Sequence, residues 1–155
     1  MISSVRQNIE SMAEIGLAAS IITIAAAGTA CATSLYEAAD VISHSNEQIY
    51  ALAKHVTQST AVLKQMAQVL REERDNCTKK VLRDIRSIKR SCKRTFREIS
   101  STVSSVNLRF IGPVKWLFKK PKTQELLVRL DSQQSLVQCV IQTLTVSKLG
   151  NMDSR

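Results

Sequence analysis

The sequence predicts an all-α fold: an antiparallel bundle of four main helices, with a fifth short N-terminal helix in one variant of the prediction. Apolar residues make up 44% of the 155 residues, enough to form a core. Only four Gly and two Pro are present, and the period-two alternation typical of strands is absent. No Gly or Pro lies between Thr29 and Ile111. A single helix there would be roughly 120 Å long, so the chain must fold back on itself.

Two polar clusters are the expected turning points. Residues 43–46 and 72–78 are rich in Ser, Asn, Asp and Thr, which end one helix and cap the next. Ser11 with Glu14 also fits a capping box. In the variant with a fifth helix, the first helix breaks near residues 10–12. The predicted domain covers residues 1–150, and residues 151–155 form a short polar tail.

The first long segment, residues 15–36, contains 22 residues without a charge, fourteen of them Gly, Ala, Ser or Thr. One helical stripe carries its larger apolar residues, with a glycine in one place: Leu17, Ile21, Ile24, Gly28, Cys31 and Leu35. The small residues favour a central bundle helix that its neighbours approach closely. The alternative is a helix that is buried in the folded protein and able to insert into a membrane, since its length permits a span. A permanent transmembrane anchor ranks third.

Apolar residues then recur every seven positions, at Leu35, Ile42, Ile49, Val56, Leu63, Leu70 and Cys77. The companion position holds Ala38, Leu52 and Met66, but Ser45, Ser59 and Glu73 interrupt it. A regular coiled coil keeps both positions apolar. The pattern therefore indicates packing within an antiparallel bundle, across the turn at residues 43–46.

The positive charge is confined to the middle third of the chain. The formal net charge is +9, yet residues 1–70 sum to −2, residues 71–122 carry 16 basic and 5 acidic side chains, and the remainder balances. Such a concentration is typical of an electrostatic footprint. Anionic lipid, nucleic acid and an acidic protein surface are the candidate partners.

Much of this charge falls on one face of one predicted helix. Apolar residues run from Val81 to Val106 at steps of three and four, and a second stripe lies about 200° around the helix. We predict that the second stripe binds an anionic surface, and the alternative is a solvated face without a partner. Its members are Lys79, Arg83, Arg86, Arg90, Lys93 and Arg97.

A second basic cluster follows. Gly112 and Pro113 are expected to break the preceding helix, Pro121 to open the last one, and Lys148 with Gly150 to end it. Before Pro121, cations flank a short aromatic and aliphatic run, a composition typical of a membrane-interface anchor; the anchor residues are Lys115, Trp116, Phe118, Lys119 and Lys120. The alternative is a Trp/Phe plug that closes one end of the bundle.

Catalytic signatures are absent from the sequence. It has no phosphate-binding loop, dinucleotide fingerprint or nucleophile elbow, and its two His lie far from its four dispersed Cys. We therefore expect no enzyme activity and no catalytic, cofactor or metal site. No secretory signal is recognisable, so we expect a cytoplasmic protein, peripheral to membrane where it binds lipid.

Several segments resemble the fungal N-terminal domains found on STAND (NACHT or NB-ARC) receptors, which are grouped with HeLo-like helical bundles. These segments are residues 20–25 (SIITIA), 34–40 (SLYEAAD), 114–120 (VKWLFKK), 124–130 (QELLVRL) and 135–137 (SLV). The resemblance spans residues 12–148 and implies a helical bundle. For several members it also implies programmed cell death triggered by exposing an N-terminal helix to membrane. No nucleotide-binding or repeat module and no amyloid-type motif follows here, which fits a stand-alone relative or a separated N-terminal domain.

Together these observations predict a non-enzymatic signalling module that acts by regulated membrane association or cell-death execution. Its expected partners are anionic membrane lipids or an acidic protein surface, together with a STAND receptor or a second copy. The alternative is a protein–protein interaction adaptor without membrane activity. Nucleic-acid binding ranks third, because the basic stripe lacks the Asn, Gln and aromatic residues that read bases.

Overall fold

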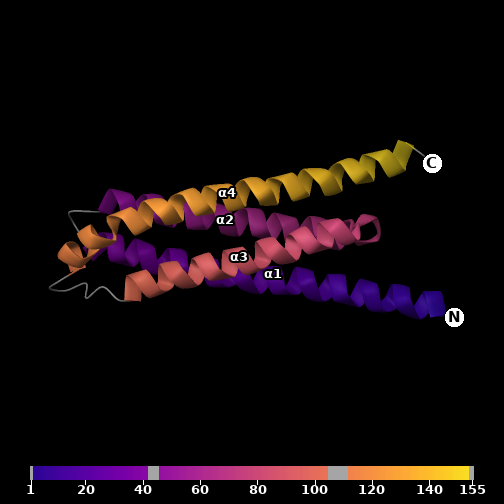
Figure 1. Ribbon diagram of the computed structural model, residues 1–155, viewed down its shortest axis with the longest axis horizontal. Helices are drawn as coiled ribbons and strands as arrows, with labels where there is room; N and C mark the ends of the chain where they lie inside the picture. The colour runs from indigo at the N-terminus through magenta and orange to yellow at the C-terminus, as the bar shows by residue number, and fades with distance from the viewer. Residues whose placement is uncertain (1, 42–45, 105–111, 154–155) are drawn as a thin grey trace.

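In the residues that it describes, the structure is a bundle of four long α-helices, which confirms the predicted all-α class (Figure 1). This computed structural model describes residues 2–41, 46–104 and 112–153, and for residues 46, 112–120 and 151 it describes the backbone alone. The elements in chain order are α1 (Ile2–Val41), α2 (Asn46–Glu72), the short 3₁₀ helix η1 (Arg74–Asn76), α3 (Lys79–Ser104) and α4 (Gly112–Asp153). No strand occurs within those described ranges.

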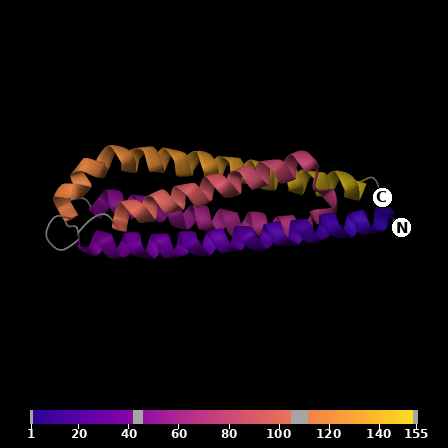
Figure 2. The same ribbon diagram turned by 60° about the horizontal axis from the view of Figure 1, so that its bottom comes forward.

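Each helix packs mainly against two others, and the neighbours do not follow chain order. Helices α2 and α3 both pack against α1 and α4, so these two consecutive helices lie across the bundle from each other. The chain direction reverses from each helix to the next, and α1 therefore runs parallel to α3, beside it in both views (Figures 1 and 2). This arrangement brings the most apolar helix and the most basic helix side by side.

Helix α1 is continuous from Ile2 to Val41, so the predicted break near residues 10–12, and with it the fifth helix, is wrong. The first Gly or Pro of the chain is Gly16, and a single glycine inside a helix costs only about 1 kcal/mol. Glu14 does not cap a helix start. It is buried instead, and Asp75 and Arg74 of the α2–α3 connection are charged neighbours of its carboxyl group.

The predicted apolar stripe forms the buried face of α1. Its six members are buried: Leu17, Ile21, Ile24, Gly28, Cys31 and Leu35. At Gly28 the neighbouring helices approach so closely that an added Cβ would lie 2.8 Å from Cε2 of Phe96 on α3. It would lie closer still to the methyl group of Thr60 on α2. Gly28 therefore marks a point where three helices meet, as the small-residue pattern predicts.

The apolar heptad positions of α2 are buried. Two polar residues that interrupt the companion position, Ser59 of α2 and Glu73 directly after it, are buried as well. Gln134 Nε2 of α4 donates a hydrogen bond to Ser59 Oγ at 3.1 Å. The Glu73 carboxylate accepts one from Asn76 Nδ2 at 3.0 Å and lies 3.2 Å from Lys148 Nζ of α4. The hydrogen bond from Asn76, and then the Lys148 ammonium, lower the pKa of Glu73. Both polar interruptions therefore contact α4: Ser59 meets Gln134, and Glu73 meets Lys148 near the C-terminal end of that helix.

The second polar cluster lies at the α2–α3 connection, as predicted, whereas most of the first lies outside the described residues. Helix α1 ends at Val41 and α2 begins at Asn46; residues 42–45, including the predicted Ser45 interruption, lie outside the described residues. At the other turn, Thr78 Oγ1 accepts a hydrogen bond from the backbone N–H of Val81 at 3.2 Å. Thr78 is therefore the N-cap of α3, which explains why that helix begins at Lys79.

Helix α4 differs from the prediction at both ends. It begins at Gly112, continues through Pro121 and runs past Gly150 to Asp153. Pro113 suits the first turn because its φ angle is already helical, whereas Pro121 removes an N–H inside the helix. Figure 2 shows α4 bending in its orange first part, as an internal proline causes. Gly150 lacks the positive φ of a C-cap. Residues 151–153 belong to α4 and not to a separate tail.

Candidate functional site: the basic face of helix α3

The six predicted cations of α3, here called the basic face, lie together on one exposed side of the helix. All six are exposed: Lys79, Arg83, Arg86, Arg90, Lys93 and Arg97. The opposite side of α3 is buried in the core through Ile85, Ile88, Cys92, Phe96 and Ile99. Since α3 rises 1.5 Å per residue, the basic face is about 27 Å long. It is thus a linear array of charges on a rigid support.

No ion pair engages the basic face among the residues that the structure describes. The cations that do pair with carboxylates there are Arg6, Lys122, Arg129 and Lys148. Helix α3 contains nine basic residues and only two acidic ones, so the helix cannot neutralise itself. Glu10 and Glu14 of α1 line a pocket with Lys79, Arg83 and Arg86 but form no ion pair with them, so these cations keep exposed positive charge for a partner.

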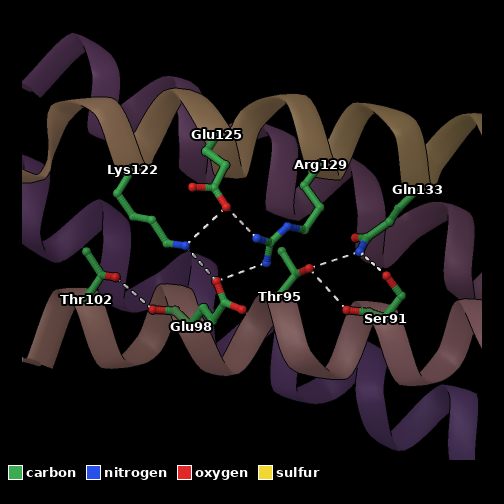
Figure 3. Close-up of polar contacts among 8 residues, drawn as sticks. All are labelled: Ser91, Thr95, Glu98, Thr102, Lys122, Glu125, Arg129 and Gln133. Atoms are coloured by element: carbon green, nitrogen blue, oxygen red, sulfur yellow. Dashed lines mark hydrogen bonds and ion pairs between the residues drawn. The ribbon is translucent and has the colours of Figure 1, made fainter.

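A network of ion pairs between α3 and α4 sets the orientation of the basic face (Figure 3). Glu98 Oε2 lies 3.1 Å from Lys122 Nζ and 2.9 Å from an Arg129 guanidinium nitrogen. Glu125 Oε1 closes the network, at 3.2 Å from Lys122 and 2.6 Å from Arg129. The positive groups of Lys122 and then Arg129, which lie against this carboxylate, lower the pKa of Glu98. Lys122 belongs to the basic middle third of the sequence, yet here it stabilises the bundle.

A second polar contact lies beside this network. The buried Gln133 of α4 donates from Nε2 to Ser91 Oγ at 2.7 Å and to Thr95 Oγ1 at 2.9 Å (Figure 3). Together with Glu98, these residues line the side of α3 that meets α4, so they fix the rotation of α3 about its axis. Sequence reasoning missed both contacts. The sequence indicates only the ion pair between Glu125 and Arg129, whose i, i+4 spacing is typical of a pair on one helix.

An open groove of about 490 Å³ runs between α1 and α3 along one edge of the basic face. Its apolar lining comes from Ile24 and Ala27 of α1 and Phe96 of α3, and its cations are Lys89, Lys93 and Arg97. Three hydroxyl groups complete the lining, from Ser20, Thr23 and Ser100. Lys89 Nζ donates to Ser20 Oγ at 3.3 Å, which ties the two helices together across the groove. The sequence gives no sign of this groove, because it forms where two separate helices meet.

The predicted membrane-interface anchor lies at the start of α4. Lys115, Trp116, Phe118, Lys119 and Lys120 have a helical backbone, and their side chains lie outside the described part of the structure. The expectation that Pro121 opens the last helix is wrong, because α4 carries this cluster and continues through Pro121. The anchor role itself stays a prediction.

The five residues predicted to form an insertable or core helix are buried in the bundle: Leu17, Ile21, Ile24, Gly28 and Leu35. By length and composition alone α1 could cross a membrane, and 44% of its most apolar window is buried here. Core helices of soluble proteins and signal sequences have the same composition, so this finding carries little weight. Within the described ranges, no three His, Cys, Asp or Glu residues are grouped so as to hold a metal ion.

Fold and site together define a four-helix bundle in which the basic face forms no ion pair with the described residues and adjoins an amphipathic groove. Comparisons of the chain with protein-family models, curated proteins and solved structures gave no significant match. The resemblance to the fungal STAND-associated domains therefore stays a prediction from the sequence.

Proposed function

We propose that this protein is a non-catalytic helical module that associates with anionic membrane surfaces through the basic face of α3. The observation that carries the proposal is the alignment of six exposed cations on one helix, none of them paired with a carboxylate of the described residues. A planar anionic surface can contact all six at once, because they share one side of a straight support.

The expected strength of this contact follows from the number of charges. Each Lys or Arg near an anionic membrane contributes about 1 kcal/mol, so the basic face contributes up to about 6 kcal/mol at low salt. The attraction falls off within a Debye length of about 8 Å at physiological ionic strength. Binding by charge alone would therefore be reversible and sensitive to salt, as suits a regulated module.

An exposed apolar stripe at the beginning of α1 supports a membrane over a purely charged partner. Ile2, Val5, Ile9 and Met12 are spaced by three and four residues and are between 56% and 87% exposed. Continued in helical steps, this stripe reaches Ser20 and Thr23, which line the groove beside the basic face. Apolar residues next to cations are the combination that binds the boundary between headgroups and acyl chains.

The signalling part of the proposal rests on the resemblance in sequence alone. In that family, membrane contact by an N-terminal helix triggers cell death in several members. For this chain to act in the same way, α1 would have to leave the bundle and expose residues such as Ile21 and Leu35, which are fully buried here. Binding of the basic face to a membrane surface needs no release of α1, so it can occur with the bundle intact.

Flotation with liposomes tests the proposal. The full chain should float with vesicles containing phosphatidylserine, remain unbound to neutral phosphatidylcholine vesicles, and lose binding as salt is raised. Reversing charge at Arg83, Arg86 and Arg90 should abolish flotation. The matched control reverses Lys54, Lys64 and Arg71 on α2, which are also exposed and change the net charge equally. This control should still float.

Two outcomes would overturn the proposal: no flotation with anionic vesicles, or equal loss of flotation in both charge-reversed variants. The second would show that net charge, rather than the basic face, attracts the protein. In one form of the first outcome, the protein binds neither kind of vesicle, and the α3 variant loses a protein complex that the α2 variant keeps. That result would replace the membrane proposal with the adaptor hypothesis.

A further inference from the structure

The groove between α1 and α3 combines two kinds of surface that a simple electrostatic patch does not need. We call its apolar lining residues Ile24, Ala27 and Phe96 the floor, and its exposed cations Lys93 and Arg97 the rim. Its volume of about 490 Å³ lies within the range of small-molecule sites. None of its lining residues is acidic, so an anion entering the groove meets no repelling charge.

We infer that this groove binds one amphipathic phosphate, with its anionic head at the rim and its hydrocarbon chain along the floor. Arg97 offers a planar donor pair that matches two phosphate oxygens, and Lys93, one helical turn earlier, supplies a second positive charge. Lys89 is half-buried and already donates to Ser20, so it holds the groove wall while the other two cations meet the ligand.

The floor distinguishes this ligand from a free anion. Inorganic phosphate would use the rim and leave the apolar lining in contact with water. A single acyl chain would cover that lining and gain the free energy of removing it from water. The inference rests on the proposed membrane association, since a lipid of the same anionic surface is the source of such a ligand.

Calorimetric titration of the full chain tests the inference in the absence of any membrane. The probe is lysophosphatidic acid below its critical micelle concentration, and the two control ligands are inorganic phosphate and an uncharged monoacylglycerol. We expect saturable binding of the probe, at least tenfold tighter than either control because it uses both the rim and the floor, roughly the worth of one charge-assisted hydrogen bond. No saturable binding would overturn the inference. Equal binding of inorganic phosphate would also overturn it, as would equal binding of the monoacylglycerol.

Variants then locate the site. Ala27→Phe fills the floor without changing charge. Ala26→Phe places the same ring on the preceding residue, which is also exposed and lies outside the groove lining. We expect Ala27→Phe to weaken binding of the probe about tenfold or more and Ala26→Phe to leave it unchanged. A second variant, Lys93→Gln with Arg97→Gln, should weaken it similarly while circular dichroism shows an intact bundle. Binding that survives both variants would place the site elsewhere.

Ligand binding in the groove and membrane association through the basic face can be tested independently. Ala27→Phe leaves all six cations of the basic face in place, so it should still float with anionic vesicles. Flotation without binding of the probe would refute the groove alone. Binding of the probe without flotation would refute the proposed membrane association while leaving the groove as a site for a soluble amphipathic phosphate.

Discussion

The close approach of three helices at Gly28 yields a sharp test of the structure. A Cβ at this position would lie 2.8 Å from Cε2 and 3.0 Å from Cζ of Phe96, and closer still to the methyl group of Thr60. Both neighbours are buried, so neither can swing into solvent. Gly28→Ala therefore adds one methyl group where the packing leaves no room for it.

Two opposing effects set the magnitude. Replacing glycine by alanine inside a helix gains about 1 kcal/mol of stability through helix propensity. Forcing an extra methyl group into a packed core costs about 1–3 kcal/mol. Gly28→Ala should therefore change the free energy of unfolding by between zero and about −2 kcal/mol. Gly16 is the matched control, because it lies in the same helix and nothing approaches its would-be Cβ within 4 Å. Gly16→Ala should stabilise by about 1 kcal/mol.

Urea unfolding followed by circular dichroism at 222 nm measures both variants. We expect Gly16→Ala to be more stable than Gly28→Ala by about 1–3 kcal/mol, or a few degrees in Tm for a chain of this length. Combining Gly28→Ala with Phe96→Leu should recover part of the loss as a coupling energy above about 0.5 kcal/mol. If Gly28→Ala stabilises as much as Gly16→Ala does, the helices do not meet at this point.

Two further predictions follow from buried titratable groups. Burial, and then the nearby Asp75, raise the pKa of Glu14 above its ordinary value of 4.5. The charged carboxylate therefore destabilises the folded state at neutral pH. This destabilisation disappears as the pH falls below 4.5, where the carboxyl group is protonated in both the folded and the unfolded chain. Glu14→Gln should therefore raise Tm at pH 7 and leave it unchanged near pH 4; a lower Tm at pH 7 would contradict this. Among the thiols, burial raises the pKa of Cys92 to about 12 and that of Cys77 to about 11, whereas Cys139 is exposed. Labelling at pH 7.4 with mass-spectrometric readout should modify Cys139 first, and equally fast labelling of Cys92 would show that α3 is not packed as described.

Local chemistry explains where sequence-based prediction of the fold succeeded. The apolar stripe of α1 and the heptad of α2 identify buried faces because helical periodicity alone decides which side chains point the same way. The polar cluster before Lys79 ends in Thr78, whose side chain caps α3. Prediction failed at Pro121 and Gly150, where residues that usually bound a helix lie inside α4. Tertiary contacts along α4, such as that between Lys148 and Glu73, stabilise the helix beyond what local propensity allows.

For the candidate site, too, the sequence predicts some features and only the tertiary structure shows the others. Spacing within one helix is enough to define the basic face, because its six cations lie on one side of any α-helix of this sequence. Spacing within one helix cannot show which cations are already engaged. Lys122 belongs to the charge excess in sequence, but Glu98 and Glu125 hold it in the α3–α4 contact.

By itself, the sequence determined that this protein is helical, which faces of α1, α2 and α3 are buried, and where the positive charge lies along the chain. Each of these depends on the period of a single helix or on composition. Only the tertiary structure decided that α1 runs beside α3 and parallel to it, that the polar residues of α4 fix the rotation of α3, and that a groove with an apolar floor and a cationic rim opens between α1 and α3. These features depend on which helix packs against which, and residues about 70 positions apart in sequence meet only when the bundle closes.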